Sequence, residues 1–185
     1  METKNLKGNI LIAEPFSQDG FFHRAVVLVC EHDDESGTVG FCLNKPLDVM
    51  LNELIDEFPE FESRVYCGGP VKKRALFFLH GYGDLIEDSK LISTGVWWGV
   101  NFEALKVLAI QGLVLPDRIR FFVGYSGWSE GQLEEELSTG SWITAEMHPN
   151  YMFKDDPTQL WQHSMENKGN NFAIIAAIPD AMNLN

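Results

Sequence analysis

The sequence predicts an α+β fold in which strands and helices share one domain, residues 1–185. Three observations lead to this prediction. Continuous apolar runs at 25–30 and 75–79 are typical of buried strands, and 118–123 is expected to be a third buried strand. Segments with helical spacing of apolar residues separate the strands, and the chain shows no internal repeat, low-complexity stretch or linker. A length of 185 residues with 45% hydrophobic and 22% charged residues fits a single folded domain.

The expected strands begin at residues 9–13. The run 25–30 and the strand 38–43 enclose a polar turn and should form an antiparallel hairpin. Asn44-Lys45-Pro46 then breaks the second strand, and 81–88 reads as a loop. Further strands are expected at 64–66, 75–79, within 91–98 (one or two short strands), 118–123 and 142–145.

About four helices are expected. The first follows Asp48 as its cap, with apolar residues recurring at helical spacing from Leu51 to Phe58. The second starts at Asn101 and ends at Gly112. The third lies between 129 and Gly140, and the fourth begins at 156–159, where N-cap, proline and glutamine stand in favoured places.

The stretch 121–137 organises the rest of the chain. It is expected to run from a buried strand through a glycine-broken corner into the third helix. Ser129 is predicted to be the N-cap, with Gln132 completing a capping box. Trp128 and Leu133 stand where a hydrophobic staple would place them. The predicted structural corner comprises Gly124, Tyr125, Gly127, Trp128, Ser129, Gln132 and Leu133.

Charge and composition argue against several classes of function. A net charge of −13 and a pI near 4.7 repel nucleic acid and anionic membranes, and no helix-turn-helix signature is present. No apolar run has the length of a membrane span, and residues 1–10 lack the apolar core of a secretory signal. Three cysteines in such a chain predict free thiols in a reducing cytoplasm.

Short motifs follow one another from about residue 8 to 166. They are Cys30-Glu31-His32, Leu43-Asn44-Lys45-Pro46, Gly68-Gly69-Pro70-Val71, Leu79-His80, Gly124-Tyr125, Gly127-Trp128, Gly131-Gln132-Leu133-Glu134 and Glu136. In this order they resemble the YqgE/AlgH family of bacterial proteins. The tail 168–185 fits less clearly. The resemblance implies a cytoplasmic mixed α/β domain with a strongly curved, largely antiparallel sheet. The family is often labelled a transcriptional regulator, but it implies no agreed activity, cofactor or catalytic residue.

The residues that could form a serine-hydrolase site or a metal site are better explained as structural residues. Residues 124–128 depart from the G-x-S-x-G elbow of serine hydrolases, so Ser126 is expected to be a corner residue, although Asp155 or Asp156 and then His163 follow in a suitable order. The groups that could hold a metal lack zinc-site spacing, so no metal is predicted. These groups are Cys30, His32, Cys42, Cys67 and His80.

Two separate spots are predicted for a ligand. The turn Gly68-Gly69 could present N–H groups to an anion beside the only basic cluster of the chain. That cluster comprises Arg64, Lys72, Lys73 and Arg74, and its structural interpretation is a solvated strand entrance that protects a sheet edge. His80 is too far from Arg74 along a strand to share a small ligand, but it could line a pocket with Asn44 and Lys45.

The preferred interpretation is therefore a cytoplasmic binding or interaction domain that contacts an unknown protein or small molecule. A regulatory role is one of the functions that such a domain can have. The alternative is an enzyme that uses polar residues near the glycine turns. Those residues are Asn44, Lys45, His80, Tyr125 and Ser126. A DNA-binding regulator comes third. No cofactor, no direct DNA binding and no membrane partner are predicted, and oligomeric state is left open.

Overall fold

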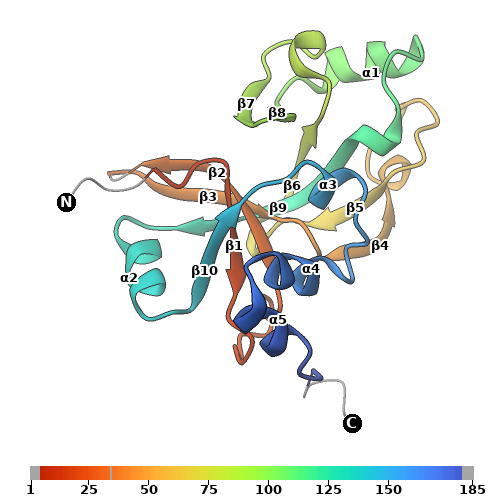
Figure 1. Ribbon diagram of the computed structural model, residues 1–185. Helices are drawn as coiled ribbons and strands as arrows, with labels where there is room; N and C mark the ends of the chain where they lie inside the picture. Colours follow the sequence, from red (N-terminus) through yellow and green to blue (C-terminus); the bar gives the residue numbers. More distant parts are fainter. Residues whose placement is uncertain (1–4, 34, 181–185) are drawn as a thin grey trace.

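The computed structural model describes residues 5–33 and 35–180 and confirms the α+β class with a curved, largely antiparallel sheet (Figure 1). Ten strands make the sheet: β1 Asn9–Ala13, β2 Val26–Asp33, β3 Gly37–Cys42, β4 Pro46–Met50, β5 Arg64–Cys67, β6 Val71–His80, β7 Lys90–Ser93, β8 Val96–Gly99, β9 Ile119–Trp128 and β10 Trp142–Glu146. The described residues form five α-helices: α1 Phe102–Ile110, α2 Gln132–Ser138, α3 Asn150–Phe153, α4 Leu160–Asn167 and α5 Asn170–Ala176.

Strand β9 joins the two halves of the sheet. The strand order is β10-β1-β2-β3-β9-β6-β8-β7. Two further strands branch from this order, because β5 pairs with β9 and β4 pairs with β5. The first half of β9 pairs with β6 and, in parallel, with β5, whereas residues 126–128 pair with β3. Figure 1 shows β7, β8 and α1 gathered at one end of the molecule and α2 with β10 at the other.

Both faces of the sheet are covered. On β1, Ile10 and Ile12 join a core that contains α3, α4 and α5 residues, while Leu11 and Ala13 join a second core with Leu133 of α2. A third core lies under α1 and includes Leu105. Side chains that alternate between two cores explain why the strand sequences are almost continuously apolar, as the sequence predicted for 25–30.

The stretch 121–137 differs from the prediction in one respect. β9 continues to Trp128, because the residues after Gly124 gain ladder partners on β3. Gly124 has φ +68, and the β6–β9 register shifts between Val71 and Leu76, so the chain bends there without leaving the sheet.

The helix after this bend begins later than predicted. α2 starts at Gln132 with Gly131 as its N-cap at φ +70, so the assignment of Ser129 as N-cap is wrong. Half of the capping box does form, because the Ser129 N–H donates to Gln132 Oε1 at 3.1 Å. Trp128 and Leu133 pack in the same core, but with Gly131 as the N-cap they do not occupy the N′ and N4 positions of the predicted staple.

Two other predicted helices are corrected. Residues 46–50 form β4, paired with β5, and only a single 3-10 turn, Leu51–Glu53, follows where a helix from Leu51 to Phe58 was expected. Glu57 has φ +60, which interrupts a helix. The last predicted helix starts at Leu160, because Asp156 Oδ1 accepts the N–H of Thr158 in a local turn.

Two short helices, α3 and α5, were not predicted. Helix α5 lies in the tail 168–185, the part of the chain that fits the family motifs less clearly. Residues 181–185 of this tail lie outside the described residues. None of the helices in the described part of the chain has the length and apolarity to span a membrane.

Candidate functional site

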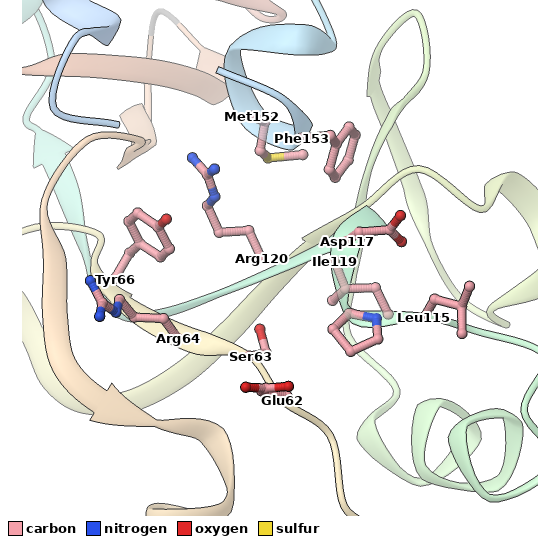
Figure 2. Close-up of a pocket in the computed structure, with 11 residues that line it drawn as sticks. Glu62, Ser63, Arg64, Tyr66, Leu115, Asp117, Ile119, Arg120, Met152 and Phe153 are labelled. Carbon is pink, nitrogen blue, oxygen red and sulfur yellow. The ribbon is translucent and has the colours of Figure 1, made fainter. Parts of the chain in front are cut away.

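A cavity of about 530 Å³ lies between β5, the start of β9 and α3. Figure 2 shows Arg120, Tyr66 and Arg64 on one side of it, with Phe153, Ile119 and Leu115 on the other. We call it the Arg120 pocket. Its lining residues are Glu62, Ser63, Arg64, Tyr66, Leu115, Pro116, Asp117, Ile119, Arg120, Met152 and Phe153.

Arg120 is the unusual member of this pocket. The residue is only 8% exposed, and its guanidinium lies 4.3 Å from the centre of the Tyr66 ring. Its Nη1 donates to the carbonyl of Leu43 at 2.9 Å, which is its one hydrogen bond within the described residues. It forms no ion pair with any carboxylate of residues 5–33 and 35–180. Arginine is almost never buried in a protein without a charged partner.

Burial lowers the pKa of the Arg120 guanidinium, and the nearby Tyr66 and Asp155 oppose this shift. The guanidinium nevertheless keeps its charge at neutral pH, since its ordinary pKa exceeds about 12. The pocket therefore holds a desolvated positive charge with four of its five N–H donors unused by the described residues.

The alternation of β9 places Arg120 in the pocket. Phe122 lies in the core beneath α3 and α4, and Arg120, two residues earlier, shares its side of the strand. Ile119 and Phe121 belong to the opposite core. An arginine thus occupies a position that an apolar residue would normally fill.

The remaining lining residues form a polar side and an apolar side of the pocket. Ser63 is buried beside the exposed Arg64, and the opposite wall consists of apolar side chains from the 115–119 segment and α3. Glu62 and Asp117 are exposed at the rim. This arrangement suits a molecule with a negatively charged group and an apolar body.

The predicted glycine-turn site proves to be a place where two backbones touch. The Gly68 N–H donates to the carbonyl of Val123 at 2.9 Å, so this donor is already used. A Cβ at Gly68 would lie 2.4 Å from the carbonyl oxygen of Gly124, and one at Gly69 would lie 2.1 Å from the carbonyl carbon of Tyr125. Contact with β9 therefore accounts for both glycines.

The basic residues that follow this turn lie within β6. Lys72, Lys73 and Arg74 are exposed side chains there, and none of them forms an ion pair within the described residues. Solvated cations of this kind carry little desolvation cost, so the structure gives no geometric reason for them to recruit a ligand.

The second predicted spot consists of side chains with their hydrogen bonds in place. Asn44 accepts the Val26 N–H at 2.9 Å and donates to the carbonyl of Arg24, and Lys45 Nζ donates to His23 O. These bonds fix the segment before β2.

His80 is fully buried and makes a different set of contacts. Its Nδ1 accepts the Tyr82 N–H, so Nε2 carries the proton and donates to Ser89 Oγ at 2.9 Å. Burial lowers the pKa of His80 to about 4, which keeps the ring neutral. His80 shares no hydrogen-bond partner with Asn44 or Lys45.

The other candidate reactive groups, a serine and two cysteines, are buried in the protein interior. The buried Ser126 hydroxyl donates to Gly68 O at 2.9 Å. Cys30 and Cys42 lie in different cores, where burial raises the pKa of both thiols, that of Cys42 to about 11. Within the described ranges, no three His, Cys, Asp or Glu side chains are grouped to hold a metal ion.

Sequence reasoning missed the Arg120 pocket. One signal was available, namely an arginine at the second position of the buried strand Ile119-Arg120-Phe121-Phe122. The short helix that supplies Met152 and Phe153 carries no cap or sustained apolar period, so the far wall could not be anticipated.

Comparison with known proteins places the chain in a family. Residues 10–173 match the family described as AlgH-like. The chain belongs to the AlgH-like family. A UPF0301 protein of Cytophaga hutchinsonii is 42% identical over 180 residues, covering 97% of this chain and 98% of the relative. A UPF0301 protein of Chlorobaculum parvum is 38% identical over 178 residues, covering 96% and 95%.

Solved structures agree with this assignment. The AlgH protein from Pseudomonas aeruginosa superposes with a TM-score of 0.74 at 27% identity, covering 97% of each chain. A protein from Corynebacterium diphtheriae superposes with a TM-score of 0.79 at 21% identity, covering 96% of this chain and 95% of that one. At this identity the likeness shows a shared fold only. The family predicted from the motifs is therefore confirmed, and these relatives bring no described activity with them.

Proposed function

We propose that this protein is a binding domain for a small organic anion, held in the Arg120 pocket by the Arg120 guanidinium. The observation that carries the proposal is a desolvated arginine without a carboxylate partner, lining a cavity large enough for a small molecule. A bound carboxylate or phosphate would supply the missing counter-charge and accept the unused N–H groups.

The apolar wall narrows the class of ligand. Leu115, Ile119 and Phe153 would contact the uncharged part of a ligand whose anionic group faces Arg120. Inorganic phosphate would leave this wall in contact with water, so an aromatic or aliphatic carboxylate or phosphate ester fits better. Tyr66 keeps the guanidinium plane in place by stacking against it.

The domain would act in the cytoplasm by binding rather than by catalysis. Any regulatory role would follow from occupancy of the pocket and not from contact with DNA, since the protein carries a net charge of −13. Regulation through ligand binding in the pocket would be an indirect form of the regulatory role with which the family is often labelled.

Isothermal titration with phenyl phosphate and benzoate tests the proposal, with benzyl alcohol as the neutral counterpart. The wild type should bind at least one of the anions and not the alcohol. Arg120→Met should weaken binding about 100-fold, the loss expected when a buried charge-assisted contact of about 2–3 kcal/mol disappears.

Lys72→Ala/Arg74→Ala serves as the matched control, because it removes two positive charges that are exposed on the neighbouring strand β6. This double variant should bind within about twofold of the wild type. Equal binding by Arg120→Met and the wild type would overturn the proposal, as would failure of both anions to bind the wild type.

A further inference from the structure

A second cavity, of about 660 Å³, lies beside the end of β10 and is closed by α3 and α4. We call it the Ser164 pocket. Helix α3 contributes to both cavities: Met152 and Phe153 line the Arg120 pocket, whereas Tyr151 lines this one. The Ser164 pocket contains neither Arg120 nor any residue predicted as a site from the sequence.

Ser164 is a buried polar group without a partner. It is 1% exposed, lines the cavity, and its hydroxyl makes no hydrogen bond within the described residues. Buried hydroxyls nearly always have a partner, since an unpaired one costs about 1–3 kcal/mol. A hydroxyl proton turns about the Cβ–Oγ bond at little cost, so a partner within the cavity can satisfy it.

Other side chains around the cavity also have hydrogen-bonding capacity to spare. The Tyr151 oxygen accepts from Asn167 Nδ2 at 2.8 Å, which leaves the phenolic proton free to donate and Asn167 Oδ1 free to accept. His148 Nδ1 accepts the Asn150 N–H, so its Nε2 carries a proton that can be donated. Lys168 uses one of its three donors on Thr144 O.

The charges of the Ser164 pocket are balanced, in contrast to those of the Arg120 pocket. Lys168 and Glu146 are its lysine and its carboxylate, and both are exposed at the rim. The deeper groups, Tyr151 and Ser164, are neutral hydroxyls. A neutral molecule with several hydroxyl groups therefore matches these donors and acceptors, and it meets no unpaired charge.

We infer that the Ser164 pocket binds a small neutral polyhydroxylated compound of the monosaccharide or cyclitol class. The Ser164 and Tyr151 hydroxyls contact ligand hydroxyls at the base of the pocket, and Asn167 and His148 do so at the rim. The Tyr151 and His148 rings, whose centres are 6.0 Å apart, supply an apolar surface for the carbon skeleton of the ring.

Amide chemical-shift titration of the whole protein with D-glucose, N-acetyl-D-glucosamine and myo-inositol tests the inference, with inorganic phosphate as the charged comparison. At least one neutral probe should shift the amides of Ala145, Tyr151 and Ser164 along a saturable curve. Phosphate should not do so.

Ser164→Ala should weaken that binding about tenfold, the effect of one hydrogen bond to a buried group. It should be at least as stable as the wild type, because it removes an unpaired buried hydroxyl and breaks no hydrogen bond. Ser138→Ala, an exposed serine on α2, should bind as the wild type does. The inference is overturned if none of the three probes shifts these amides, if phosphate alone does, or if Ser164→Ala binds as tightly as the wild type.

Discussion

Two groups of positive charge lie on the neighbouring strands β6 and β9, and they differ in every respect that matters for binding. Lys72, Lys73 and Arg74 of β6 are adjacent in sequence and exposed to solvent. Arg120 of β9 is isolated in sequence, 8% exposed, stacked on Tyr66, and without an ion-pair partner in the described part of the chain. A cluster is conspicuous in sequence, but water already solvates it. The single buried charge has lost most of its contact with water and has gained no ion-paired carboxylate, so it is the stronger candidate for anion binding.

The largest effect is expected from a change at the glycine turn, and it should be on stability. Gly68→Ala should cost at least about 3 kcal/mol of unfolding free energy, because its Cβ would lie 2.4 Å from the Gly124 carbonyl oxygen and must force two strands apart. Gly20→Ala is the matched control, since nothing lies within 4 Å of its Cβ. Urea unfolding measures both. A Gly68→Ala protein of wild-type stability would restore the turn as a candidate anion site.

A smaller effect is expected at His80, the buried titratable group whose hydrogen bonds are complete. Burial lowers the pKa of folded His80 to about 4, whereas its ordinary value is 6.5. Between these values the unfolded chain binds more protons, so stability is complete above pH 6.5 and falls as the pH decreases toward 4. The contribution of His80 to this loss should be up to about 3 kcal/mol.

Denaturant unfolding at several pH values, on the wild type and on His80→Gln, isolates this contribution. His80→Gln should flatten the dependence between pH 6.5 and about 4, because glutamine stays neutral throughout. His163→Gln, which removes an exposed histidine, is the comparison variant. The same slope in wild type and His80→Gln would show that His80 is not held neutral by its surroundings.

Much of the fold could be predicted from the sequence, because its signals are local. The apolar strands, the hairpin at 25–43 and the Asn101 cap of α1 were all correct, the last through the 2.9 Å bond from the Ala104 N–H. The helix expected after Asp48 does not form, because residues 48–50 belong to β4, which pairs with β5, and the positive φ of Glu57 interrupts the residues that follow.

The site could not be predicted to the same extent. The Arg120 pocket joins segments near residues 63, 119 and 152, which only the folded chain brings together. Alternation along β9 placed Arg120 on an interior face, but whether a carboxylate would face it depends on the position of α3, for which the sequence carries no clear signal. The basic cluster and the glycine pair could be recognised in the sequence. The exposure of the cluster to solvent and the packing of the glycines against β9 could not.

The measurement that tests the central claim most directly is the unfolding free energy of the wild type and of Arg120→Met, each with and without saturating phenyl phosphate. Without ligand, Arg120→Met should be within about 1 kcal/mol of the wild type or more stable, since methionine removes an uncompensated buried charge while filling similar space. With phenyl phosphate, the wild type alone should gain stability. If Arg120→Met loses more than about 2 kcal/mol without ligand and phenyl phosphate stabilises neither protein, Arg120 is a structural tie to Leu43 and the account is contradicted.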